Sequence, residues 1–189
     1  MENILSIKNL SMSYRVGKKL IKALDDITLE VRKGSSMGIV GESGCGKSTL
    51  ALAIMKLLPQ NATIHDGQIL LSGEDILRSN DKRIREIRWN EISIIFQGAM
   101  NALNPVVKIG AQVKEPLIKH QAKKIGMLEM DTKVMELIKS VSLVPEVLSR
   151  YPHELSGGMK QRVMVAMSLI CSPQIIIADH AAYRAGAVT

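Results

Sequence analysis

The segment from Gly41 to Thr49 constrains the fold of this chain more than any other part of the sequence. It fits the pattern G-x-x-x-x-G-K-[ST] of a loop that holds phosphate groups. Such a loop requires a buried strand before it and a helix after it, because the loop N–H groups and the helix N-terminus must point at one anion. Residues 37–40 are apolar, and residues 50–58 favour a helix that stops at Pro59. The sequence therefore predicts a strand over 37–40 and a helix over 50–58 on the two sides of the loop.

The residue types in this loop have separate physical tasks. Its glycines permit sharp turns and a close approach of the backbone to phosphate. Lys47 has the reach to bind β- and γ-phosphates, and the Ser48 hydroxyl is suited to ligate Mg²⁺. The alternative, a solvated surface lysine, is disfavoured by the setting of strand, loop and helix. The predicted nucleotide-binding residues of the loop are Gly41, Glu42, Ser43, Gly44, Cys45, Gly46, Lys47, Ser48 and Thr49.

The composition of the 189 residues indicates a globular protein. Hydrophobic residues make up 46% of the chain, yet no apolar run approaches the roughly 18 residues that a membrane span needs. The first residues lack the basic and apolar regions of a secretory signal, and two cysteines do not make a disulfide framework. We therefore expect a cytosolic protein.

The net charge of +7 raises the question of a nucleic-acid partner. The basic residues are scattered, and no aromatic residue lies within the densest cluster, residues 119–124. Aromatic residues are only 3% of the chain, so stacking on bases has little support. A solvated helix end is the favoured interpretation of the cluster, and a basic face near anionic lipid headgroups is the alternative. We expect no nucleic-acid partner.

The first half of the chain is predicted to be rich in strands. Alternating apolar residues predict strands over 4–14 and 23–31, joined by a turn at 16–19. A further strand lies between two turns within 65–73, and the charged segment 79–89 is predicted as a short helix.

The second half is predicted to be mainly helical. Residues 91–96 are a candidate buried strand that ends at Gln97, and two helical patterns lie within 108–148. A further helix is predicted over 159–171. In the second of the two patterns, one apolar face is made of Met130, Val134, Leu137, Ile138 and Val141. We interpret this face as core packing and not as a binding surface.

These motifs follow one another in an order that resembles a known family. The run Leu155-Ser156-Gly157-Gly158-Met159-Lys160-Gln161-Arg162 is similar to the LSGGQ signature of ABC ATPases, with Met159 where glutamine is commonest. An apolar strand, 175–179, follows it and ends in Asp179. The phosphate loop, Gln97, this signature and this strand together resemble an ABC transporter ATP-binding subunit over residues 3–179.

The resemblance implies an α/β fold, that of an ABC-type nucleotide-binding domain of the P-loop NTPase class, incomplete at its C-terminal end. Such a domain has a RecA-like core, an antiparallel β subdomain and a helical subdomain that docks on membrane subunits. The implied division of this chain is a β subdomain with the phosphate-loop core (1–97), the helical subdomain (98–155), the signature helix with the Walker B strand (156–179), and an aberrant tail (180–189).

The family's residue roles transfer onto matching positions. Tyr14 would stack on adenine, although an ordinary strand tyrosine is the alternative. Lys47 and Gln97 would serve catalysis, and Mg²⁺ would be held by Ser48, Gln97 and Asp179. The signature residues implied to contact ATP on a second subunit are Leu155, Ser156, Gly157, Gly158, Met159 and Gln161.

Three shorter stretches of the sequence resemble the dipeptide, oligopeptide and nickel uptake branch of the family. The matching stretches are 40–44, 87–89 and 96–105, the last of which ends in Leu-Asn-Pro. The resemblance implies ATP and Mg²⁺ as cofactors. It implies a second ABC ATPase subunit, two transmembrane permease subunits and an extracytoplasmic solute-binding protein as partners. The chain would then lie peripherally on the cytoplasmic face of the cell membrane.

The sequence departs from the family pattern after Asp179. The family continues with Glu and Pro, a loop and a downstream switch histidine, whereas His180 stands here at the position of the general base. Imidazole differs from carboxylate in shape and is often partly cationic, so we expect little turnover. One explanation is a short protein that binds ATP without hydrolysing it. The favoured one is an incomplete reading of a longer gene.

A third function class is a soluble ABC ATPase that acts on ribosomes or DNA. Such proteins usually carry duplicated cassettes or long coiled-coil insertions, and neither is visible in this sequence. We therefore disfavour that class.

Overall fold

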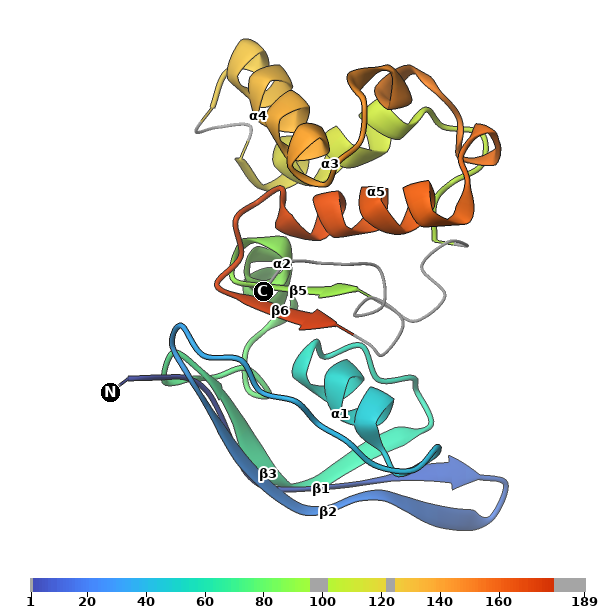
Figure 1. Cartoon of the computed structure of the whole chain (residues 1–189). Helices are drawn as coiled ribbons and strands as arrows, with labels where there is room; N and C mark the ends of the chain where they lie inside the picture. Colours follow the sequence, from blue (N-terminus) through green and yellow to red (C-terminus); the bar gives the residue numbers. More distant parts are fainter. Residues whose placement is uncertain (1, 96–101, 122–124, 179–189) are drawn as a thin grey trace. The chain divides into compact units, whose positions relative to one another are not determined.

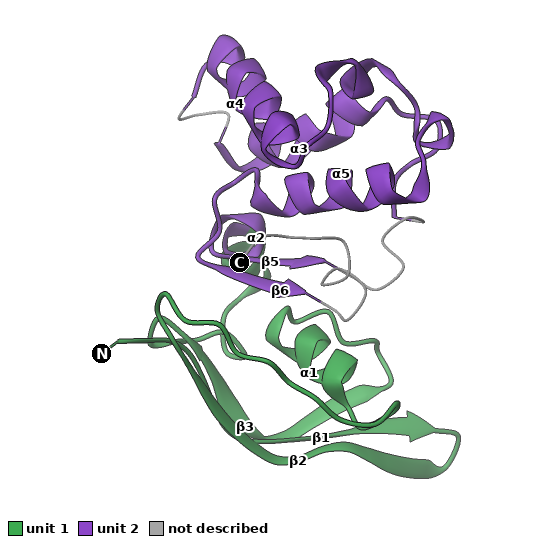
Figure 2. Ribbon diagram, in the orientation of Figure 1, with its two compact units in different colours: residues 1–85 green, residues 86–189 purple. Residues whose placement is uncertain are grey.

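The computed structural model describes residues 2–95, 102–121 and 125–178. The chain divides into two compact units, unit 1 (residues 1–85) and unit 2 (residues 86–189), which Figure 2 draws in green and purple. Of the residues singled out above, Gln97, Asp179 and His180 lie outside the described ranges.

Unit 1 is built on a four-stranded antiparallel sheet with the strand order β2-β1-β3-β4 (Figure 1). Strands β1 (Asn3–Val16) and β2 (Lys19–Arg32) form a long hairpin. Strand β3 (Ala62–Leu71) pairs with the other edge of β1, and the short β4 (Glu74–Asp75) pairs with β3. The three strands predicted for this region are confirmed, and each begins earlier than its hydrophobic pattern indicated.

The β1–β2 hairpin closes through a two-residue turn that begins at Gly17. The φ of Gly17 is +60°, which is the conformation of the first central residue in a type II′ turn. Val16 pairs with Lys19 across this turn, and two positions further Tyr14 pairs with Ile21. The turn thus fixes which side chain lies opposite Tyr14.

Helix α1 (Lys47–Ile54) begins inside the phosphate-loop motif. Its residues Leu50, Ala53 and Ile54 are buried in the core of unit 1. The helix predicted over 50–58 is confirmed, but it starts three residues earlier and ends well before Pro59. The left-handed conformation of Lys56, with φ of +51°, ends the helical path.

The strand predicted at residues 37–40 is wrong. This segment has no regular structure, and its residues Met37, Ile39 and Val40 are 48%, 50% and 95% exposed. An apolar segment forms a buried strand only where a neighbouring strand takes up its backbone hydrogen bonds. In the described part of the chain no strand pairs with this segment. The sequence pattern shows that the segment is apolar, but it does not show whether a neighbouring strand is present to pair with it.

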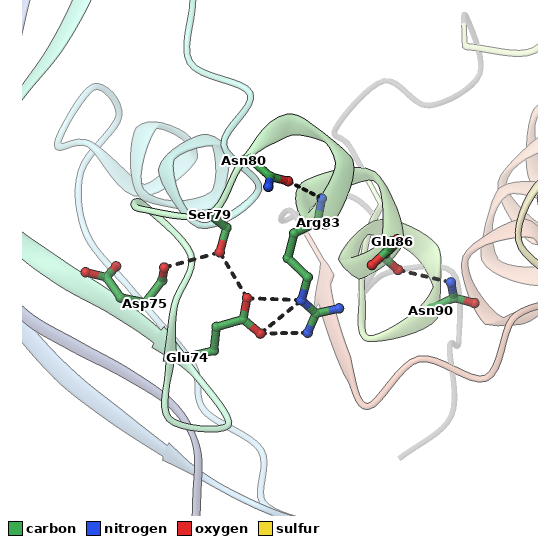
Figure 3. A network of polar contacts seen from close by, with 7 residues as sticks. All are labelled: Glu74, Asp75, Ser79, Asn80, Arg83, Glu86 and Asn90. Carbon is green, nitrogen blue, oxygen red and sulfur yellow. Dashed lines mark hydrogen bonds and ion pairs between the residues drawn. The ribbon is translucent and has the colours of Figure 1, made fainter.

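An ion pair ties the β3–β4 region to helix α2 (Asp81–Asn90), as Figure 3 shows. Arg83 donates from Nε to both carboxylate oxygens of Glu74 at 3.0 Å, and from Nη2 to one of them at 2.7 Å. The Ser79 hydroxyl donates to the same carboxylate at 3.0 Å. The hydrogen bonds from Arg83 lower the pKa of Glu74 below its ordinary value, against the opposing effect of burial. The short helix predicted here is confirmed, with a break in its backbone at Trp89, where φ is +72°.

Unit 2 combines a small parallel sheet with helices. Strands β5 (Ile92–Ile95) and β6 (Ile175–Ala178) pair in parallel, as strands of an α/β sheet do. Strand β5 is mostly buried, whereas Ile176 of β6 is 42% exposed. The described part of unit 2 also contains the α-helices α3 (Ile109–Gln121), α4 (Met127–Ser140) and α5 (Gly157–Leu169). Two short 3₁₀ helices precede α5: η2 (Pro145–Ser149) and η3 (Pro152–Glu154).

The three α-helices share one hydrophobic core. On α4, Met130, Val134 and Ile138 are buried, and Leu137 and Val141 pack against them, which confirms that the predicted apolar face is core. The other helices contribute Ile109, Val113, Leu117, Val163 and Ala166, and Ile170, directly after α5, also belongs to this core.

The basic cluster begins in the last turn of α3. There the side chain of Lys119 is 67% exposed and pairs with Glu115 one turn earlier, as a solvated helix end would. Residues 122–124 of the cluster lie outside the described ranges. Within those ranges no helix combines the length and the apolar character that a membrane crossing requires.

Candidate functional site

Lys47 is held by the backbone of its own loop. Its Nζ donates to the carbonyl oxygen of Gly41 at 2.8 Å and to that of Glu42 at 2.7 Å, and lies 3.4 Å from Cys45 Sγ. Among the described residues no carboxylate pairs with this ammonium. Neutral carbonyl oxygens orient the charge without cancelling it, so Lys47 presents a fixed positive charge to an incoming anion.

Two glycines in the loop stand where a side chain would collide. Gly46 has φ of +97°, and a Cβ added there would lie 2.6 Å from the Ala23 carbonyl oxygen and 3.1 Å from Leu24 Cδ2. A Cβ at Gly41 would lie 2.7 Å from Cys45 Sγ. At Gly46 the loop therefore rests directly on the backbone of strand β2 and requires glycine, whereas at Gly41 the Cys45 thiol could turn aside.

The first turn of α1 completes an anion site. The first N–H groups of a helix have no partner within the helix, and together they carry the positive end of its dipole. No acidic residue lies in this turn to cancel that field. With Lys47 and the loop N–H groups, this geometry fits the phosphates of a nucleotide.

The proposed magnesium ligands are only partly described. Ser48 is exposed in the first turn of α1, and a hydroxyl oxygen suits Mg²⁺ chemically. The other two, Gln97 and Asp179, lie outside the described ranges. The part of the chain that the structure describes holds no cluster of three or more His, Cys, Asp or Glu side chains suited to a metal.

Tyr14 reaches the phosphate-loop helix from strand β1. Its hydroxyl donates to Thr49 Oγ1 at 3.3 Å, a contact between residues 35 positions apart. The aromatic residue assigned to the base and the last residue of the loop motif are thus brought within one hydrogen bond of each other.

Two apolar side chains beside Tyr14 were not singled out from the sequence. Ile21 is its cross-strand partner, and Val16 lies two residues further along the same face of β1. They are 53% and 56% exposed. Counting the register outward from the Gly17 turn gives the pairing of Tyr14 with Ile21, so the sequence did carry a signal that could have found them.

The signature residues lie at the beginning of α5. Ser156 is the N-cap of this helix, and its Oγ accepts a hydrogen bond from the Met159 N–H at 3.3 Å. Gly157 and Gly158 form an exposed first turn, whereas Leu155 is buried in the core of unit 2 and anchors the segment. The exposed helix N-terminus is a second arrangement suited to an anion.

The named residues therefore fall into three groups. Tyr14, Lys47 and Thr49 are brought together in unit 1. The signature residues, including Gln161 on α5, belong to unit 2. Gln97, Asp179 and His180 lie outside the described residues.

Comparison with known families gives one match that covers most of the chain. The sequence model described as ABC transporter matches residues 24–183. The chain is 42% identical over 183 residues to the dipeptide transport ATP-binding protein DppD of Bacillus subtilis (strain 168), covering 95% of this chain and 54% of that protein. It is 42% identical over 181 residues to the oligopeptide transport ATP-binding protein OppD of Lactococcus lactis subsp. cremoris (strain SK11), covering 95% of this chain and 53% of that one.

Solved structures give the same fold. A bacterial ABC transporter cassette solved as a dimer superposes with a TM-score of 0.83 at 27% identity, covering 96% of this chain and 78% of that one. A post-hydrolysis state of an ATP-binding cassette bound to ADP and Pi gives a TM-score of 0.82 at 28% identity, with the same coverage. The chain spans about half the length of the curated relatives it matches.

Proposed function

The chain belongs to the ABC transporter family, and from that premise we propose that it is the ATP-binding part of an importer subunit. In this proposal ATP binding and hydrolysis drive the uptake of peptides or similar small solutes. The observation that carries it is the ammonium of Lys47, which two loop carbonyls orient and no described carboxylate neutralises. The cargo class rests on the peptide-transport relatives.

The proposed nucleotide site assigns one task to each part of the loop. Lys47 binds the β- and γ-phosphates, and the N–H groups of the loop and of α1 bind phosphate oxygens. Ser48 holds Mg²⁺ together with Gln97 and Asp179, and the metal supplies charge neutralisation at the phosphates. The Tyr14 ring stacks on the base, flanked by Val16 and Ile21.

The proposed partners follow from the signature segment. Ser156, Gly157 and Gly158 at the exposed start of α5 contact the γ-phosphate of ATP on a second ABC ATPase subunit. Two transmembrane permease subunits and an extracytoplasmic solute-binding protein complete the transporter. The chain then works at the cytoplasmic face of the membrane, and Mg²⁺ with ATP are its cofactors.

A second candidate function is nucleotide binding without hydrolysis. The observation that favours it is His180 at the position where the family carries its glutamate general base. A carboxylate accepts a proton from water throughout the neutral range, whereas imidazole is partly protonated there. Binding through the loop does not depend on that base.

The proposal is tested by titrating the purified chain with Mg-ATP in a calorimeter. The Lys47→Ala variant should bind about tenfold to a hundredfold more weakly, because charge-assisted hydrogen bonds to phosphate are lost. Lys139→Ala, at the end of α4, removes a lysine charge outside the loop and should leave the affinity unchanged. Equal affinities for the wild type and Lys47→Ala would contradict the proposal.

A further inference from the structure

The tip of the β1–β2 hairpin carries basic and apolar side chains together. Residues 15–22 are all exposed, and no acidic residue lies among them. The basic residues of the tip are Arg15, Lys18, Lys19 and Lys22, and the apolar ones are Val16, Leu20 and Ile21. Leu20 is 59% exposed, although a leucine side chain gains free energy by leaving water. Apolar side chains gathered on an exposed element mark a contact surface.

The hairpin tip extends past strand β3, as Figure 1 shows. Strand β3 pairs with β1 as far as Tyr14, whose partner is Ala62. The Arg15 N–H then donates to the Asn61 carbonyl at 2.8 Å, and Asn61 Nδ2 donates to the Arg15 carbonyl at 3.2 Å. Beyond Arg15, β1 pairs with β2 alone among the described strands. Both faces of the tip are therefore open to a partner.

The two faces of the tip differ in chemistry. Side chains alternate between faces along a strand, and residues directly opposite each other share a face. Tyr14 and its partner Ile21 therefore lie on one face, whereas Arg15, its partner Leu20, and Lys22 lie on the other. The alkyl stem of an arginine or lysine can lie along apolar surface while its charge reaches outward. This second face is thus amphipathic, and it is separate from the residues proposed to flank the base.

The positive charge of the tip is largely unneutralised. Within the described residues, Lys22 is the one basic residue of the tip with an ion-pair partner, Asp25 at 2.9 Å. The two side chains are 61% and 66% exposed, and such pairs contribute little because water screens them. The end of β3 beside the hairpin, residues 61–64, is uncharged. The tip therefore attracts anions.

An anionic lipid surface takes up both kinds of side chain at once. Lipid phosphates attract lysine and arginine, and the boundary between headgroups and acyl chains accepts apolar side chains. Single-stranded nucleic acid would require aromatic side chains for stacking, and residues 15–22 contain none. An acidic protein segment would match the charges but would cover little of Leu20 on a two-stranded tip without a groove. The lipid surface is the partner that the chemistry favours.

We propose that the tip of the β1–β2 hairpin binds an anionic membrane surface through the face of Arg15, Leu20 and Lys22, with Lys18 in the turn. Leu20 enters the headgroup boundary, and the basic side chains contact lipid phosphates. The inference goes beyond nucleotide binding and does not depend on it, because Lys47 and the ring of Tyr14 take no part in the contact.

The experiment is sedimentation of the purified chain with lipid vesicles. The chain should bind vesicles of equal parts phosphatidylcholine and phosphatidylglycerol, more weakly as salt is added, and should not bind phosphatidylcholine alone. Arg15→Gln combined with Lys18→Gln should weaken binding about tenfold to thirtyfold, because each basic side chain near the surface contributes separately. Leu20→Ser should weaken it about fivefold or more, because the apolar contact is lost.

A charge-matched control separates the tip from the net charge of the chain. Lys119→Gln combined with Lys139→Gln removes two charges from helix ends in unit 2 and should leave vesicle binding nearly unchanged. Leu20→Ser should bind Mg-ATP as the wild type does, so this inference and the proposed function are tested separately. Circular dichroism of each variant establishes that the fold is retained.

Insertion of the tip has its own measurement. Trp89 is the one tryptophan of the chain, so Leu20→Trp adds a single fluorophore. Its emission, after subtraction of the wild-type signal, should shift to shorter wavelength when the anionic vesicles are added.

Three results would overturn the inference. Equal losses in the tip pair and the control pair would show that net charge alone attracts the chain to lipid. An unshifted emission of Leu20→Trp on bound vesicles would show that the tip stays in water. Tighter binding to single-stranded RNA or to polyglutamate than to the vesicles, lost in the tip variants, would assign the tip to that polyanion instead.

Discussion

The two cysteines show how burial decides the chemistry of single residues. Cys45 lies exposed in the phosphate loop, whereas Cys171 is 4% exposed in the core of unit 2. Burial raises the pKa of the Cys171 thiol to about 11, and the nearby charge of Lys133 only partly opposes this shift. The nucleophilic thiolate of Cys171 is therefore scarce near neutral pH.

We expect a thiol reagent at pH 7 to label one cysteine per chain, and that cysteine to be Cys45. Mass spectrometry of the labelled peptides measures this directly. The Cys45→Ser variant should take up no label until denaturant exposes Cys171. Labelling of Cys171 in the folded chain at the rate of Cys45 would contradict the burial described here.

The sequence predicts which residues form the phosphate loop, but it does not predict the hydrogen bonds that they make. The motif identifies Lys47 because local spacing alone defines the pattern. Its carbonyl partners, Gly41 and Glu42, depend on how the loop curls. The bond from Tyr14 to Thr49 depends on a strand meeting a helix across 35 positions, which no local pattern encodes.

The start of helix α1 depends on the backbone conformation of one residue, Gly46. Its N-cap, Gly46, combines a left-handed backbone with contact against the Ala23 carbonyl. Gly44 has a similar φ of +83°, but a Cβ there would meet nothing within 4 Å. Both positions therefore favour glycine because of their positive φ, but only Gly46 lacks the space for a side chain.

We expect Gly46→Ala to destabilise the chain more than Gly44→Ala does. The left-handed conformation costs roughly 1–2 kcal/mol for alanine at either site. At Gly46 the added methyl group must also displace the backbone of β2, from which it would lie 2.6 Å. Urea unfolding followed by circular dichroism measures both free energies. Equal losses for the two variants would mean that the loop does not press on β2.

Helices and strands could be predicted where the residues close together in the chain carry a clear pattern. The apolar face of α4 repeats at helical spacing, so its burial followed from the sequence. The segment 37–40 is equally apolar, yet it forms no strand and stays exposed. A helix satisfies its own hydrogen bonds, whereas a strand needs a partner from elsewhere in the chain. The break in α2 at Trp89 had no local signal either.

For the molecule as a whole, the residues proposed to bind the nucleotide and those proposed to support its hydrolysis lie in different parts of the chain. The phosphate loop and Tyr14 both lie in unit 1, and the signature lies in unit 2. His180, which stands at the position of the family's general base, and two of the proposed magnesium ligands, Gln97 and Asp179, fall outside the described residues. The family match is established, and the chain spans about half the length of its curated relatives.

We expect the purified chain to release no phosphate from Mg-ATP above the background of its Lys47→Ala variant. The reason is that His180 replaces the carboxylate that would accept the proton of water. A coupled phosphate assay over several turnovers measures this. Sustained release that Lys47→Ala abolishes would contradict the prediction. If release were also lost in His180→Ala, the histidine would be acting as the base.

Local sequence patterns alone predict the phosphate loop, the signature, the family and the apolar face of α4, because each depends on residues close together in the chain. The folded chain is needed to see that Tyr14 hydrogen-bonds Thr49, that Gly46 rests on β2, and that 37–40 forms no strand. These depend on which distant segments meet. That choice is made by strand pairing and packing over the whole chain, and local patterns constrain it only weakly.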